Sequence, residues 1–247
     1  MDAEEVLSKI NQAALEEASE LDLSGLGLRS LPPQVWNLTN LTFLNLEHNE
    51  LTALPPEIRY LTNLTGLVLA DNQLIGLPPE IVKLTQLDLL SLSDNQLTKL
   101  PPEIGNLTSL RDLHLGVNQL TELPLEIGNL PSLRGLELYR NQLTELPPEI
   151  DNLTSLRELI LGDNQLTKLP PEIGNLTSLR DQHLEYNQLT ELPSQIGDLT
   201  GLERLSVGNN QLTAIPQSMV KLEKLSQGRS SIRVLGNLCP MGESSVA

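Results

Sequence analysis

The amino-acid sequence predicts an α/β repeat solenoid, in which one short strand per repeat stacks into a parallel sheet. Asparagine recurs at a constant interval along most of the chain, and the segment DNQLTKLPPEIGNLTSLR occurs twice, starting at Asp94 and at Asp163. A fixed period of about 20–50 residues is typical of proteins built from stacked supersecondary units. Aromatic residues make up only 2% of the chain, so we expect leucine to fill the core.

Each recurrent asparagine lies where the chain should turn away from its strand. Its side-chain amide can both donate to and accept from loop backbone, so stacked asparagines should form a buried, hydrogen-bonded ladder. The ladder residues are Asn49, Asn72, Asn95, Asn118, Asn141, Asn164, Asn187 and Asn210.

The repeat consensus LxxLxLxxNxLxxLPxxIxxLxx explains the remaining elements. The LxL pair alternates with period two, which predicts a short strand with both leucines facing inward. Leu90, Leu113 and Leu136 are examples, and Gln182 is the polar exception at this position. The Leu-Pro-Pro-Glu-Ile stretch cannot be a central strand, because proline has no N–H for the ladder. We expect it to be extended or 3₁₀ on the convex side.

The repeats divide the chain into four parts. Residues 1–17 should form an N-terminal capping helix with an apolar stripe at Val6, Ile10 and Ala13. Residues 18–224 hold nine repeats. Residues 225–240 are expected to form a degenerate C-terminal capping repeat, and residues 241–247 a disordered tail.

This consensus resembles the intracellular, Ras-suppressor-type leucine-rich repeats of bacterial Roco GTPases and eukaryotic signalling scaffolds. The resemblance covers about residues 18–224. It implies a horseshoe with a parallel sheet on its concave side, and a protein-binding scaffold rather than an enzyme. The phosphate-binding motif G-x-x-x-x-G-K-[ST] does not occur in the sequence, so the GTPase part of a Roco protein is not expected here.

Charge and composition restrict the partner and the compartment. A net charge of −16 should repel nucleic-acid backbones. No apolar run reaches the length needed to span a membrane, and the N-terminal segment MDAEEVLSKINQAALEEASE lacks the features of a signal peptide. The single cysteine, Cys239, cannot form an internal disulfide. We therefore expect a cytoplasmic monomer that binds another protein and neither nucleic acid nor a membrane.

The outward positions around the strands vary from repeat to repeat, whereas the scaffold positions barely change. Interface anchors are often aromatic or arginine residues. Tyr139 has Gly116 and Gly162 at the same position of the two adjacent repeats, which predicts open space beside its ring. The predicted partner-binding residues are His114, Tyr139, Arg140, Ile160, His183 and Tyr186.

Neither a metal site nor a catalytic site is expected. The three histidines, His48, His114 and His183, are about three repeats apart, which corresponds to about 14 Å at about 4.8 Å per strand. A shared metal ion needs ligands at about 2 Å. His183, Glu185 and Tyr186 cluster in one repeat, but an open sheet offers them no enclosed pocket and no nucleophile. We therefore predict no cofactor and no enzymatic activity.

Other regular rows leave alternatives open. Arg111, Arg134, Arg157 and Arg180 should stack along one edge. They could bind a carboxylate-rich partner or balance the neighbouring acids Asp112, Glu158 and Asp181, and the second interpretation is favoured. Threonine rows could order water on a surface- or ice-binding protein, although turn formation also explains them. The chain could also be the recognition segment of a larger Roco-type GTPase.

Overall fold

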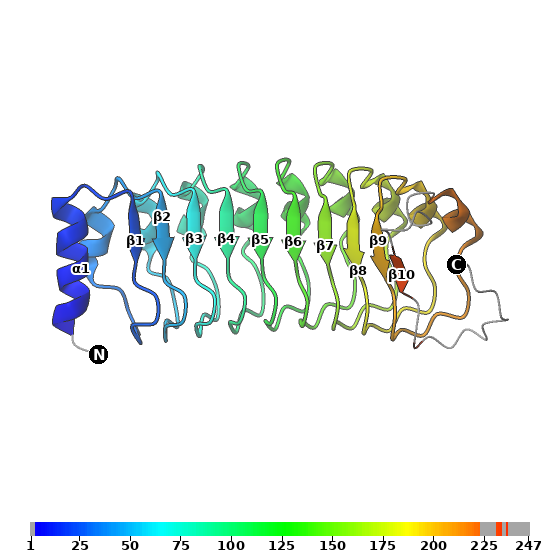
Figure 1. Cartoon of the computed structure of the whole chain (residues 1–247), viewed down its shortest axis with the longest axis horizontal. Helices are drawn as coiled ribbons and strands as arrows, with labels where there is room; N and C mark the ends of the chain where they lie inside the picture. Colours follow the sequence, from blue (N-terminus) through cyan, green and yellow to red (C-terminus); the bar gives the residue numbers. More distant parts are fainter. Residues whose placement is uncertain (1–2, 223–230, 234–235, 237–247) are drawn as a thin grey trace.

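The structure is a computed structural model that describes residues 3–222, 231–233 and 236. Within these residues, ten strands form one sheet in chain order, and every neighbouring pair is parallel. The strands lie in one row, with α1 (Ala3–Leu15) beyond β1 at one end (Figure 1). The strands are β1 (Glu20–Asp22), β2 (Phe43–Asn45), β3 (Gly66–Val68), β4 (Leu89–Ser91), β5 (Asp112–His114), β6 (Gly135–Glu137), β7 (Glu158–Ile160), β8 (Asp181–His183), β9 (Arg204–Ser206) and β10 (Ser231–Arg233). The predicted fold class, a horseshoe-like repeat solenoid, is confirmed.

The sheet register follows the sequence period. Leu90 pairs with Leu113, and Leu113 pairs with Leu136 in the next strand. All three leucines are fully buried, as the LxL pattern predicts. Because each strand position pairs with the equivalent position of the next repeat, the buried leucines form a row along the solenoid that Gln182 interrupts in β8.

The opposite side of the solenoid consists of short 3₁₀ helices, as predicted for the proline-rich segments. In most of them a proline in the extended region precedes the helix, and a second proline occupies one of its first positions. Proline fits there because the first N–H groups of a helix have no internal partner. The 3₁₀ helices are η1 (Pro33–Asn37), η2 (Pro56–Tyr60), η3 (Pro79–Lys83), η4 (Pro102–Asn106), η5 (Leu125–Asn129), η6 (Pro148–Asn152), η7 (Pro171–Asn175), η8 (Ser194–Asp198) and η9 (Gln217–Lys221).

Helix α1 covers the first repeat with its apolar face. Val6, Ile10 and Ala13 are buried in the same core as the repeat leucines. At the other end, β10 pairs with β9 in the usual parallel register. Apart from β10 and Gly236, the predicted C-terminal capping repeat and the whole predicted tail lie outside the described residues.

The asparagine ladder has the same geometry in every central repeat. Asn141 donates from Nδ2 to the carbonyl oxygens of Leu115 at 2.9 Å, Leu138 at 3.0 Å and Tyr139 at 3.3 Å. Its Oδ1 accepts from the Leu120 N–H at 3.0 Å. Each asparagine thus joins its own turn to the preceding repeat, and all eight ladder residues are buried.

The residue before each ladder asparagine is in the left-handed conformation. From His48 to Asn209, all eight residues at this position have φ between +51° and +57°. Asparagine and aspartate tolerate this region, whereas for a β-branched residue it is a strained outlier. Val117, with a φ of +54°, is the β-branched member of the row.

We expect Val117→Asn to raise the free energy of unfolding by about 1 kcal/mol, because asparagine relieves the strain of a β-branched side chain at positive φ. Urea denaturation measures the change. Val68→Asn is the matched control, because Val68 lies in β3 and is not among the residues with positive φ. If Val117→Asn is no more stable than wild type, the positive φ of Val117 does not destabilise the folded protein.

Candidate binding surface on the sheet

Three outward positions of each repeat form the concave face of the sheet. They are the first and third residues of the strand and the second residue after it. Between β1 and β9 the first row is Glu20, Phe43, Gly66, Leu89, Asp112, Gly135, Glu158, Asp181 and Arg204. The centre row is Asp22, Asn45, Val68, Ser91, His114, Glu137, Ile160, His183 and Ser206. The third row is Ser24, Glu47, Ala70, Ser93, Gly116, Tyr139, Gly162, Glu185 and Gly208.

The predicted binding residues separate into two places. His114, Ile160 and His183 lie in the centre row, in strands β5, β7 and β8. Tyr139 lies in the third row. Arg140 and Tyr186 instead occupy left-handed turns beyond the strands. The sequence analysis placed them on the concave face itself, and the structure puts them at its edge, because the chain leaves the sheet one residue earlier.

The space beside Tyr139 is not open as predicted. A Cβ on Gly116 would overlap the ring atoms Cε1, Cζ and Cδ1 of Tyr139, so the ring lies across Gly116. On the other side, the carboxyl group of Glu185 reaches over Gly162, at 3.4 Å from where a Cβ would be. The two glycines therefore accommodate side chains of this protein.

Tyr139 is half-buried in this position, next to acidic groups. Burial raises the pKa of its hydroxyl, and the carboxylates of Asp94 and Glu137 raise it further, whereas Arg140 lowers it. One side of the ring faces the sheet at Gly116. This arrangement can accept a cation against the ring, since an aromatic face and a carboxylate both attract positive charge.

Ion pairs connect adjacent repeats along the face and its edge. His114 Nε2 lies 3.9 Å from Glu137 Oε1, and His183 Nδ1 lies 3.5 Å from Glu185 Oε1. At the turns, Arg140 Nε lies 3.8 Å from Asp163 Oδ2. All of these groups are partly or largely exposed, so they contribute little to stability.

His48, in an equivalent turn, pairs with Asp71 of the next repeat. The hydrogen bond to Asp71 is the main cause that raises the pKa of the His48 imidazole, and desolvation opposes it. His48 is therefore held in its protonated form up to a higher pH than an isolated imidazole would be.

The first row of the concave face was missed as part of the surface. It carries Asp112, Glu158 and Asp181 in consecutive or near-consecutive strands. Counting back two residues from the centre row would have found it, because side chains two apart in a strand share a face.

The arginine row lies just before the strands. Arg111 Nε is 3.3 Å from Asp88 Oδ1, and Arg180 Nη1 is 3.0 Å from Glu203 Oε1. Acids of the same row pair with these two arginines, rather than the predicted Asp112 and Asp181. Within the described part of the chain, Arg134 and Arg157 form no ion pair with a carboxylate. The row therefore borders the acidic face with positive charge.

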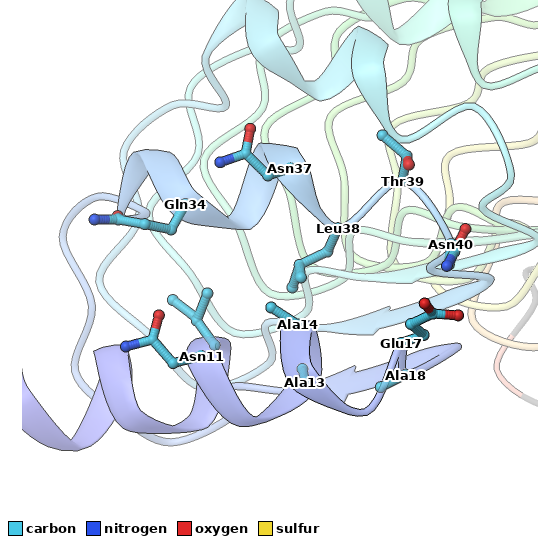
Figure 2. A pocket seen from close by; sticks show the side chains of 11 residues that line it. Asn11, Ala13, Ala14, Glu17, Ala18, Gln34, Asn37, Leu38, Thr39 and Asn40 are labelled. Carbon is cyan, nitrogen blue, oxygen red and sulfur yellow. The ribbon is translucent and has the colours of Figure 1, made fainter.

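Two hollows in the described part of the chain lie away from these residues. A cavity of about 230 Å³ separates α1 from η1. Ile10, Ala13 and Leu38 contribute apolar lining, and Asn11, Gln34 and Asn37 contribute amides (Figure 2). A wider groove of about 730 Å³ runs along the first repeats and is lined mainly by threonine, serine and amide side chains. Neither includes a residue predicted to bind a partner.

Among the described residues, no group of three or more His, Cys, Asp and Glu side chains is placed to hold a metal ion. In the same part of the chain, no helix combines the length and the apolar character needed to cross a bilayer.

A parallel sheet with a regularly repeated, mainly leucine core and a variable outer face defines a repeat solenoid, an architecture whose extended faces commonly bind other proteins. Comparison with known families agrees. Residues 20–119 and 110–185 match the family described as "Leucine-rich repeat region". The chain belongs to the leucine-rich-repeat proteins. A search of curated proteins finds no match.

Solved structures give the same fold. A leucine-rich-repeat protein of Leptospira interrogans superposes with a TM-score of 0.87 at 39% identity, over 92% of this chain and 57% of that one. The ectodomain of the receptor kinase GASSHO1/SCHENGEN3 from Arabidopsis thaliana, in complex with CASPARIAN STRIP INTEGRITY FACTOR 2, gives 0.79 at 36% identity, over 93% and 28%. An internalin of Listeria monocytogenes gives 0.77 at 28% identity, over 90% and 63%. The chain thus spans about half of the Leptospira protein.

Proposed function

We propose that this protein is a binding scaffold that recognises another protein through the concave face of its sheet, with the contact centred on Tyr139. The observation that carries the proposal is that the inward positions of the repeats are nearly constant whereas the outward positions vary. The inward leucines and the ladder asparagines repeat with almost no change, whereas the outward rows change at nearly every repeat. Extended variable faces on a rigid core are the usual binding surfaces of solenoids.

The neighbours support a protein partner. The Arabidopsis ectodomain is solved with CASPARIAN STRIP INTEGRITY FACTOR 2, and a plant peptide hormone receptor, RGFR1, superposes with a TM-score of 0.76 while in complex with RGF2. Around Tyr139 we place His114, Ile160 and His183 in the contact. Arg140 and the 56%-exposed Tyr186 form its margin at the turns.

Capture of partners from the native lysate tests the proposal. We expect the Tyr139→Ala/Tyr186→Asn double variant to retain about a tenth or less of the protein captured by the wild type, because aromatic anchors dominate interface energies. Asparagine suits the positive φ of Tyr186, since Asn209 occupies the equivalent turn. The control is Glu103→Gln/Glu172→Gln, which changes only η4 and η7 on the convex side. Loss in the control and full capture by the tyrosine variant would move the site to the convex side.

The second candidate is that this scaffold is the recognition segment of a longer protein, such as a Roco-type GTPase. It is supported by the partial coverage of the solved neighbours, 57% for the Leptospira protein and 28% for the Arabidopsis ectodomain. Sequencing the transcript beyond codon 247 tests it. A nucleotide-binding domain in the same reading frame would support this candidate, and a stop codon would rule it out.

A further inference from the structure

The concave face carries a strong excess of negative charge. Its three rows between β1 and β9 contain eight carboxylates and a single arginine, Arg204. The whole chain has 32 acidic residues against 16 basic ones, so the face is far more acidic than the overall composition requires. The eight carboxylates are those of Glu20, Asp22, Glu47, Asp112, Glu137, Glu158, Asp181 and Glu185.

The single arginine on this face does not neutralise it. Arg204 pairs with Asp181 of the preceding strand. His114 and His183 lie 3.9 Å and 3.5 Å from Glu137 and Glu185, and partly exposed pairs of this kind are weak. The face therefore keeps an excess of negative charge that a partner can contact.

Five of the eight acids, Asp112, Glu137, Glu158, Asp181 and Glu185, lie in or just after strands β5 to β8, the part of the face that includes Tyr139. Its ring lies across Gly116, and the ring is close enough to the carboxylates of Asp94 and Glu137 for both to act on its hydroxyl. Two strands further on, Glu185 reaches over Gly162. The second oxygen of Glu185, Oε2, is buried and has no hydrogen-bond partner among the described residues. A rotation of the carboxyl group would present that oxygen to an N–H donor of a partner.

We propose that the partner of the concave face presents a basic, extended segment, with lysine or arginine side chains placed over the Tyr139 ring and beside Glu137 and Glu185. The inference rests on the proposed function and names the chemistry of its partner. Two cationic side chains would contact sites about two strands apart, roughly 10 Å. An extended peptide covers that length in about three residues. Arg134 and Arg157, which directly precede β6 and β7, form no ion pair with a carboxylate among the described residues. They would orient the segment, because they repel its cationic side chains from the side of the face where the strands begin.

A fluorescein-labelled hexa-arginine peptide with blocked ends is the probe, with hexaglutamate as the opposite charge, and fluorescence anisotropy is the measurement. We expect hexa-arginine to bind at low salt and to weaken as salt rises, since exposed charges are screened. Hexaglutamate should not bind. Absence of hexa-arginine binding, or tighter binding of hexaglutamate, would overturn the proposal.

Hexa-arginine is also attracted by the net charge of −16 of the whole protein, so binding to this face must be distinguished from that general attraction. Glu137→Gln/Glu185→Gln and the convex pair Glu103→Gln/Glu172→Gln each remove two charges. We expect the concave pair to weaken hexa-arginine binding about fivefold or more and the convex pair less than about twofold, because only the former removes direct charge contacts. Tyr139→Leu keeps the apolar contact but removes the aromatic attraction, and should weaken binding about twofold to fivefold. Equal weakening by both glutamate pairs refutes a site on this face.

The two proposals can fail separately. If capture of a native partner depends on Tyr139 and Tyr186 while hexa-arginine does not bind, the concave face binds a protein whose contact segment is not basic. If hexa-arginine binding depends on Glu137 and Glu185 while capture is unaffected by the tyrosine variant, the face recognises cations and the native contact is centred elsewhere.

Discussion

Replacing Asn141 with alanine is expected to lower the free energy of unfolding by about 3 kcal/mol. The side chain is buried, and it joins three carbonyl oxygens and one N–H from its own repeat and the preceding one. Alanine leaves these buried groups without that partner. An unsatisfied buried group costs about 1–3 kcal/mol, and part of the loss is recovered where a carbonyl keeps its other bonds.

Urea denaturation followed by circular dichroism measures this loss. Asn152→Ala is the matched control, because Asn152 ends η6 on the surface and is exposed. It should change the free energy of unfolding by less than about 0.5 kcal/mol. If the two variants unfold at the same urea concentration, the hydrogen bonds of Asn141 do not stabilise the folded protein.

The second large effect has the opposite sign. We expect Gln182→Leu to raise the free energy of unfolding by about 2 kcal/mol. Gln182 is fully buried at an inward strand position, and neither Nε2 nor Oε1 has a hydrogen-bond partner among the described residues. Its strand neighbours in register are Leu159 and Leu205. Leucine would continue that row and remove the uncompensated desolvation of an amide.

Thermal unfolding and urea titration both measure the gain, and the reverse change tests the reason for it. Leu113→Gln, whose strand neighbours in register are Leu90 and Leu136, should lower stability by at least about 2 kcal/mol, because it buries an amide without partners. A Gln182→Leu variant that melts at or below the wild-type temperature would show that an internal water satisfies the amide, and that the leucine displaces it.

The proposed binding surface was only partly predictable. The centre row follows from the LxL alternation, and His114, Ile160 and His183 are where the pattern places them. Arg140 and Tyr186 were assigned to the face, because the sequence does not show that the chain enters a left-handed turn one residue earlier. The signal for that turn was present, since the same row holds glycine, aspartate and asparagine, which tolerate positive φ.

The repeat pattern alone was sufficient to predict the register of the strands, the leucine core and the asparagine ladder. It could do so because every repeat has the same local pattern, and each inward position must meet its equivalent in the next repeat. The direction in which the outward side chains lean follows only from the packing of one repeat against the next. Tyr139 and Glu185 both lean toward the preceding repeat, over Gly116 and Gly162, whereas Phe43 leans toward the following repeat, over Gly66. Those directions, and the charge that they concentrate on one face, depend on contacts between repeats that no local preference encodes.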